Sequence, residues 1–238
     1  MKSKGSMISS TQDIRKLLVV PDEDAATPIK DSEAQFIHDF LVSNKIQKTL
    51  EVGLAYAKSA AHIIAATENK HIAIDPFQDN YQRLGLTNID NLGLTNYLDF
   101  REDFSHNVLP QLLIEKAKFE FIFIDGDHKF DGEFIDFYYS DLLLESNGFV
   151  LLHDTWMRST RLLMHFIKNN RKDFKKVPTP LRNFALYQKV GKDNRNGMHF
   201  KEFYTFKSIV SHNLILWMSS GKNTGLKQLL LRLKDAVK

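Results

Sequence analysis

The stretch FEFIFIDGDHKFDGEFIDFYYSDLLLESNGFVLLHDTW, Phe119–Trp156, decides the fold of this chain. It opens with an apolar, strand-like run, Phe119–Ile124, and continues with phenylalanines near helical spacing up to the turn pair Asn147-Gly148. A second apolar run, Phe149–Leu152, follows this turn. The order strand, helix, strand predicts a βαβ unit with two parallel strands.

Ionisable residues follow both strands of this unit at the point where each strand ends. Asp125 and His128 come after the first strand, and His153 and Asp154 come after the second. Ligands of open α/β sheets bind at the carboxyl ends of the parallel strands. We therefore expect these side chains to share one site, and two carboxylates at neighbouring strand ends favour a functional role.

Upstream of this unit, Thr49–Gly53 predicts a short strand that ends in glycine, and Ala60–Thr67 predicts the following helix. Small residues between a strand and a helix let a ligand approach the backbone and the free amides of the helix N-terminus. A phosphate-binding P-loop is excluded, because Lys58-Ser59 comes one residue early and lacks the preceding glycine; a dinucleotide fingerprint would need more than Gly53. A nucleoside-binding turn fits best, with a plain tight turn as the alternative.

A carboxylate follows the next predicted strand, His71–Asp75. An acidic residue about 20 positions after a glycine turn can accept hydrogen bonds from two ribose hydroxyls. Tyr97–Arg101 predicts a third strand, and Ser105 begins a helix that runs to Glu115. Asp103, Phe104 and Ser105 would then border a bound base.

The rest of the chain predicts one α/β domain with two extensions. Residues 1–30 are polar and predict an arm, after which Ser32 and Gln35 match a capping box for a helix that ends near Asn44. A helix over Arg158–Asn170 and a hairpin of strands over 174–177 and 184–190 predict an antiparallel edge on a mostly parallel sheet. We place the domain at residues 31–190 and a C-terminal helical extension at 191–238. This extension has a net charge of +6 and an apolar stripe at Leu226, Leu230, Leu233 and Val237.

Composition excludes several classes of function. The 238 residues include no cysteine, so disulfides, a thiolate nucleophile and a cysteine zinc site are excluded. The net charge of +3 is well short of the basic surface typical of nucleic-acid binding. No apolar run is long enough for a membrane span, and no apolar core follows the basic N-terminus as in a secretory signal. We expect a cytoplasmic protein.

Four motifs together resemble the class I S-adenosylmethionine-dependent methyltransferases. More narrowly, they resemble a bacterial branch of O-methyltransferase-like proteins with an IDG-x-H motif and an HD or DD pair; the motifs are Glu51–Ser59, Ile74–Gln78, Phe123–His128 and Leu152–Asp154. The resemblance runs in order from about Ser32 to Val190. It implies a Rossmann-like seven-stranded, mostly parallel sheet with an antiparallel last strand and helices on both faces. It also implies methylation of a hydroxyl on a small molecule or glycan.

The resemblance assigns roles to particular residues. Binding of S-adenosylmethionine is implied for Glu51, Gly53, Ala55, Ser59, Asp75, Ser105 and Asp125. Asp125 and His128 are the candidate catalytic residues, with His128 as the base because its unperturbed pKa lies near neutrality. Some relatives bind a divalent cation, magnesium or manganese, through the residues that match Asp125, His153 and Asp154.

Two positions depart from the family pattern and leave alternatives open. Ala57 stands where relatives have glycine. His153 stands where metal-using relatives often have a carboxylate, and a histidine at this position weakens the case for magnesium. A strand-end histidine hydrogen-bonded to the protein is the other interpretation of His153. The alternatives to a methyltransferase are a non-catalytic binding or regulatory protein with the same fold and a metal-dependent hydrolase. A homodimer through the N-terminal arm or the C-terminal helix is also predicted.

Overall fold

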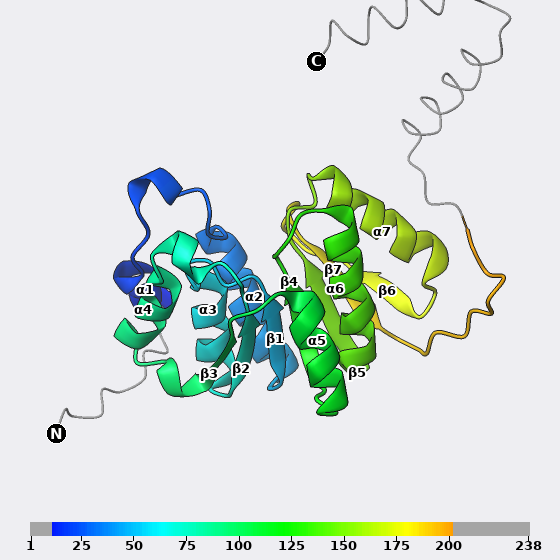
Figure 1. The fold of residues 1–238 in the computed structure, drawn as a ribbon, viewed down its shortest axis with the longest axis horizontal. Coiled ribbons are helices and arrows are strands. Elements are labelled where there is room, and N and C mark those ends of the chain that lie inside the picture. The colour runs from blue at the N-terminus through cyan, green and yellow to red at the C-terminus, as the bar shows by residue number, and fades with distance from the viewer. Residues whose placement is uncertain (1–10, 202–238) are drawn as a thin grey trace, which may run out of the picture.

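A seven-stranded sheet forms the centre of the computed structural model, which describes residues 11–201 (Figure 1). The strand order is β3-β2-β1-β4-β5-β7-β6, and only β7 runs antiparallel to its two neighbours. This arrangement confirms the predicted fold class. The strands are β1 (Thr49–Val52), β2 (His71–Ile74), β3 (Leu98–Arg101), β4 (Phe119–Ile124), β5 (Leu144–Leu152), β6 (Phe174–Val177) and β7 (Ala185–Lys189).

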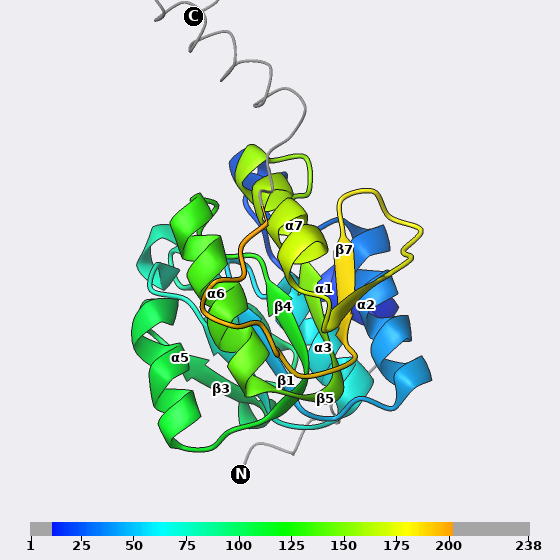
Figure 2. The ribbon, with the colours of Figure 1, turned by 90° about the vertical axis from the view of Figure 1, so that its right-hand side faces the viewer.

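Helices cover both faces of this sheet, with α5 and α6 on one face and α2 on the other in Figure 2. Side chains alternate between the two faces of a strand. Ile122 of β4 therefore packs with Phe137 of α6 in one core cluster, while Phe121 packs with Ile37 of α2 in another. The helices are α1 (Thr11–Leu17), α2 (Asp31–Asn44), α3 (Lys58–Thr67), α4 (Leu84–Asn91), α5 (Ser105–Ile114), α6 (Phe130–Leu143) and α7 (Arg158–Asn170).

The strand β5 begins earlier than the sequence indicates. It starts at Leu144, directly after α6, and includes Asn147 and Gly148, so the predicted turn at this pair is wrong. The pairing of β4 with β5 shifts between Phe119 and Phe121, and Asn147 has φ of 66°. A bulge with asparagine in the left-handed region explains why a turn-like pair lies inside a strand.

The start of α2 also differs from the prediction. The helix begins at Asp31, and the backbone N–H of Lys30 donates to Glu33 Oε2 at 2.8 Å. The predicted cap of Ser32 and Gln35 is therefore wrong, because Glu33 already reaches back to the helix end. Gln35 Oε1 instead accepts hydrogen bonds from α1.

The N-terminal segment contains a helix that packs on the domain. Ile14 of α1 is fully buried, and the side-chain amide of Asn88 in α4 forms two hydrogen bonds with the backbone of Val19, both 2.9 Å long. A single 3₁₀ turn, Asp22–Asp24, precedes α2. The predicted apolar stripe of the C-terminal extension lies outside the described residues. Among residues 11–201, no helix has the length and apolar character needed to cross a bilayer.

A buried arginine joins the far edge of the sheet to α6 and α7. Arg171 is 4% exposed, and its guanidinium lies 2.6 Å from carboxylate oxygens of Asp141 and Asp173. The guanidinium also lies 5.0 Å from the centre of the Phe174 ring, within the range of a cation–π contact. This cluster connects the start of β6 to α6.

Candidate active site

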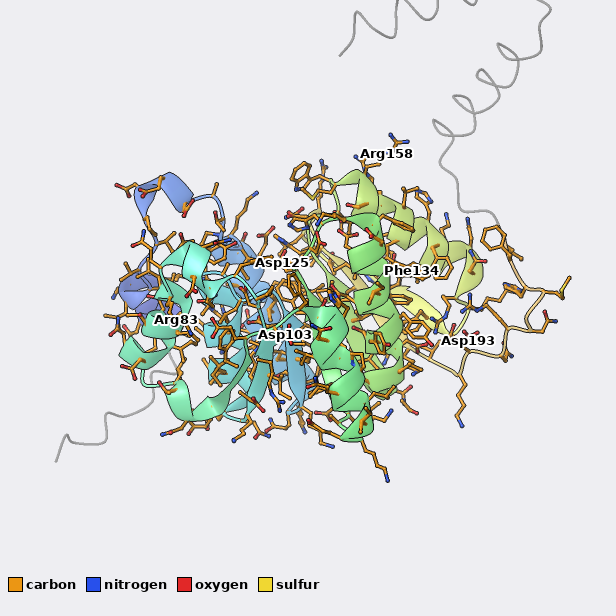
Figure 3. All side chains as sticks on the ribbon, viewed as in Figure 1. Arg83, Asp103, Asp125, Phe134, Arg158 and Asp193 are labelled. Carbon is orange, nitrogen blue, oxygen red and sulfur yellow. The ribbon has the colours of Figure 1, made fainter. Side chains whose placement is uncertain are left out.

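Two adjoining cavities lie at the carboxyl ends of the strands. The turn cavity, about 520 Å³, is lined by Gly53, Asp75, Phe77, Phe104 and Ser105 among others. The outer cavity, about 680 Å³, lies between residues 26–33, residues 153–156 and the β6–β7 loop. Both cavities are lined by Ala55, Tyr81, Asp125, Gly126 and His128. They therefore meet at the end of β4, and Figure 3 shows Asp125 in the middle of the molecule.

Glycine is required at position 53 by a close approach of two strand ends. Gly53 has φ of +95°, and a Cβ added to it would lie 2.2 Å from the backbone oxygen of Asp125. Ala55 and Ala57 also have left-handed backbones, with φ of 42° and 62°. Alanine therefore adopts the conformation that glycine would provide at position 57, at a conformational cost of about 1 kcal/mol.

Asp75 holds the turn after β1 in place. Its Oδ2 accepts hydrogen bonds from the backbone N–H groups of Leu54 and Ala55, at 3.0 and 2.9 Å. Its Oδ1 accepts a hydrogen bond from the N–H of Phe77 at 2.7 Å. Asp75 lines the turn cavity although it is only 5% exposed. The carboxylate thus positions the turn from inside the cavity wall.

Two aromatic rings form an apolar wall of the turn cavity. Phe77 and Phe104 pack edge to face with ring centres 5.6 Å apart, and the two residues are 49% and 45% exposed. Ser105 lines the cavity beside them. Such rings can contact a planar group. Phe104 was predicted to lie here, whereas Phe77, only two residues after Asp75, was not among the predicted site residues.

Two predicted cofactor residues lie behind this cavity. Glu51 is fully buried, and its Oε1 is 3.5 Å from Nε2 of His71. Burial raises the pKa of Glu51, and the residue lines neither the turn cavity nor the outer cavity. Ser59 lines a third cavity of about 30 Å³ between the turn and Thr27. The predicted contact of Glu51 with the cofactor stays a prediction.

His153 is held between two carboxylates. Its Nδ1 lies 2.8 Å from Asp125 Oδ1, and its Nε2 lies 3.4 Å from Glu33 Oε2 and 2.9 Å from the Asn183 side-chain amide. Burial alone would lower the pKa of His153, but hydrogen bonds to Asp125 and Glu33 raise it to about 10. The two carboxylates favour the charged imidazole, whereas the Asn183 amide nitrogen beside Nε2 favours the neutral ring, and both ring nitrogens contact the protein. Because both nitrogens are engaged within the protein, the geometry favours an internal hydrogen-bonding role for His153 over metal ligation.

Two partners of His153, Glu33 and Asn183, were not predicted from the sequence. Glu33 is contributed by α2 and lies 120 positions away in sequence. For Glu33, burial would raise the pKa, but the His153 hydrogen bond and the Lys30 N–H lower it to about 2. An acidic residue three positions after Lys30 indicates a helix cap by Glu33. It does not indicate that Glu33 contacts His153, the residue after β5.

Three ionisable side chains converge where the two cavities meet. Asp125, His128 and Asp154 each offer a ligand atom, and these atoms lie within 4.8 Å of one another. His128 Nε2 is 3.4 Å from Asp154 Oδ2, and its Nδ1 is 3.9 Å from Glu133 Oε1. Glu133 chiefly, with help from the other two carboxylates, raises the pKa of His128. Two carboxylates and one imidazole fit a manganese- or zinc-like ion better than magnesium.

We expect a buried carboxylate beneath this site, Asp136 of α6, to make stability depend on pH. Asp136 is 1% exposed, and burial raises its pKa from 3.8 to about 7 despite the nearby Ser105 hydroxyl. Because the folded pKa lies above the unfolded value, the contribution of Asp136 is complete below pH 4 and is lost as pH rises through about 7. The unfolding free energy of Asp136→Asn minus that of the wild type should therefore increase by up to about 4 kcal/mol between pH 4 and pH 8.

Urea unfolding at several pH values measures this difference. The exposed carboxylate of Asp131, on the same helix, provides the matched variant Asp131→Asn. The difference in unfolding free energy between Asp131→Asn and the wild type should change by less than about 0.5 kcal/mol over the same pH range. A difference for Asp136→Asn that stays constant with pH would contradict the prediction.

A comparison with family models matches residues 50–155 to a family described as a methyltransferase domain. Caffeoyl-CoA O-methyltransferase 1 of Eucalyptus globulus is 32% identical over 99 residues, which cover 40% of each chain. Tricin synthase 1 of Oryza sativa subsp. japonica is 31% identical over 103 residues, again 40% of each chain. The matches thus span about two fifths of the length of these curated relatives.

Solved structures share the fold at low sequence identity. The O-methyltransferase from Bacillus cereus in complex with SAH has a TM-score of 0.60 at 14% identity, covering 76% of this chain and 92% of that one. The O-methyltransferase TomG from Streptomyces achromogenes, in complex with SAM, has a TM-score of 0.60 at 15% identity and covers 80% and 100%.

Proposed function

We propose that this chain, which carries a domain of the class I S-adenosylmethionine-dependent O-methyltransferase family, methylates a hydroxyl group of a small molecule. The observation that carries the proposal is the junction of two cavities at Asp125, Gly126 and His128. The methyl donor would occupy the turn cavity and the acceptor the outer cavity. The reacting atoms would then meet at the end of β4, beside ionisable side chains.

The walls of the turn cavity suit the parts of S-adenosylmethionine. Gly53 lines this cavity at the turn after β1, where the amino-acid end of the cofactor would lie. Phe77 and Phe104 would contact the adenine ring, with Ser105 at its edge. Asp75 holds the turn through Leu54 and Ala55 and faces the same cavity, where the ribose would lie.

His128 is the residue best placed to take the proton of the acceptor hydroxyl. It lines both cavities, and Asp154 and Glu133 lie on either side of its ring. The hydroxyl oxygen would attack the methyl carbon as the carbon–sulfur bond breaks, and the hydroxyl proton would pass to His128. Asp125, His128 and Asp154 could instead hold a divalent cation, which when bound would orient the hydroxyl and lower its pKa.

Calorimetry with S-adenosylhomocysteine, followed by methyl transfer from labelled S-adenosylmethionine to a panel of hydroxylated compounds, tests the proposal. We expect binding at one site, weakened at least about tenfold by Phe104→Ala because a base loses its aromatic contact. Ile114→Ala, at the exposed far end of α5, should bind as the wild type does. No binding of S-adenosylhomocysteine would overturn the proposal. Binding without transfer to any compound would favour a non-catalytic protein.

Neither alternative derived from the sequence receives support from the comparisons. A hydrolase would leave the turn cavity and its aromatic wall without a purpose. The glycan acceptor, the homodimer and the cytoplasmic location stay predictions.

A further inference from the structure

We propose that the methyl acceptor carries an oxyanion, a carboxylate or a phosphate, which Lys30 and Arg182 bind in the outer cavity. This inference rests on the proposed function, because it takes the outer cavity as the acceptor site. Its basis is an imbalance among the charged side chains of that cavity. The carboxylates there have partners within the protein, whereas these two cations have none among residues 11–201.

The three carboxylates of the outer cavity are each engaged. Glu33 accepts a hydrogen bond from the Lys30 backbone and contacts His153, and Asp125 contacts the same imidazole. Asp154 Oδ1 accepts hydrogen bonds from the Trp156 indole at 2.9 Å and from the Asn183 amide at 3.2 Å. Each of these acidic groups therefore already has a partner within the protein.

The Lys30 ammonium and the Arg182 guanidinium are exposed and unpaired within the described part of the chain. Four other arginines, Arg83, Arg101, Arg171 and Arg195, pair with carboxylates, while Arg158 forms no ion pair among the described residues. The backbone of both Lys30 and Arg182 is nevertheless held by hydrogen bonds. The carbonyl of Arg182 accepts a hydrogen bond from the Thr155 hydroxyl at 2.6 Å, and the Lys30 N–H is fixed by Glu33.

The chemistry of these two side chains selects an oxyanion. A guanidinium presents a planar fork that donates two hydrogen bonds to a carboxylate or phosphate, and an ammonium adds a second charge. Trp156 lines the same cavity, is 64% exposed, and has its indole nitrogen fixed on Asp154. A ring that carries both a hydroxyl and an oxyanion would therefore find an aromatic surface and two cations in one cavity.

Matched acceptors test the inference. The protein with bound S-adenosylhomocysteine is titrated by calorimetry with 3,4-dihydroxybenzoate, its neutral methyl ester and 4-hydroxyphenyl phosphate; methyl transfer to each is measured separately. We expect at least one of the two anions, the carboxylate or the phosphate, to bind at least about tenfold more tightly than the ester. The stronger of the carboxylate and the phosphate identifies which oxyanion the site prefers.

Substitutions that remove one charge locate the anion. Arg182→Gln and Lys30→Gln should each reduce the anion-to-ester affinity ratio about tenfold, while S-adenosylhomocysteine binds as in the wild type. The matched control is Arg158→Gln: Arg158 is exposed at the start of α7 and lines neither cavity, and Figure 3 shows its side chain at the upper edge of the molecule. This control should leave the ratio unchanged.

The outcomes separate this inference from the proposed function. Equal binding of the anions and the ester, no binding of any of them, or an equal effect of Arg158→Gln and Arg182→Gln would overturn the inference. Methyl transfer to the ester and the anions at equal efficiency would do so while leaving the methyltransferase proposal intact. Anion-selective binding without methyl transfer to any compound would support the cation pair and count against the proposed activity.

Discussion

Replacing Gly53 by alanine should abolish binding of S-adenosylhomocysteine and destabilise the domain by about 2 to 4 kcal/mol. The new Cβ would lie 2.2 Å from the backbone oxygen of Asp125 and 2.8 Å from its carbonyl carbon. Both are backbone atoms of the residue that follows β4, so no side-chain rotation can relieve the overlap. The left-handed φ of +95° adds a conformational cost. Because the turn and Asp125 both line the turn cavity, the displacement also changes the binding site.

Gly93→Ala is the matched control for this experiment. Gly93 also has a left-handed backbone, with φ of +70°, but a Cβ added there meets no atom within 4 Å. Gly93→Ala should lower the free energy of unfolding, measured in urea, by only about 1 kcal/mol and leave the affinity for S-adenosylhomocysteine unchanged. If Gly53→Ala binds S-adenosylhomocysteine like the wild type and unfolds like Gly93→Ala, the close approach of β1 and β4 is not essential to the site.

Replacing His128 by alanine should reduce methyl transfer by about 10²- to 10⁴-fold, as expected for the loss of a general base. The imidazole lines both cavities and is 38% exposed at its side chain, so an acceptor can reach it. The carboxylates of Asp154 and Glu133 would stabilise the imidazolium that forms. Single-turnover kinetics with saturating S-adenosylmethionine would separate this loss from weaker cofactor binding.

The control for His128 is His165→Gln, which replaces a histidine of α7 that lines neither cavity. Its rate should match that of the wild type. Both variants are assayed with and without a chelator, because Asp125, His128 and Asp154 could also hold a cation. A wild-type rate that survives chelation supports His128 as the base. A rate that disappears with chelation and returns with manganese would assign the three residues to a metal site.

Local sequence patterns were sufficient to predict most of the sheet. The bounds of β4, Phe119–Ile124, and of α7, Arg158–Asn170, are those predicted. Buried parallel strands are nearly continuous apolar runs, so their ends show as abrupt changes to polar residues. The same reasoning located Gly53, Asp75, Asp125 and Asp154 around the cavities, because the carboxyl ends of parallel strands share one edge of the sheet.

Other features depended on contacts between distant segments. The cap of α2 was predicted at Ser32 but lies at Lys30 in the structure, because the Glu33 carboxylate accepts a hydrogen bond from the Lys30 N–H. The same carboxylate contacts His153. No periodicity in either segment indicates a contact between residues 120 positions apart.

The sequence by itself determined the strand–helix order, the strand ends and the set of ionisable residues beside the two cavities. Only the tertiary structure decided what each of these residues can do. His153 was a candidate metal ligand in the sequence, but in the structure both of its ring nitrogens are engaged within the protein, and its hydrogen bonds to Asp125 and Glu33 raise its pKa to about 10. Proton affinity and ligand capacity depend on distances and desolvation, which the fold sets and local sequence does not encode.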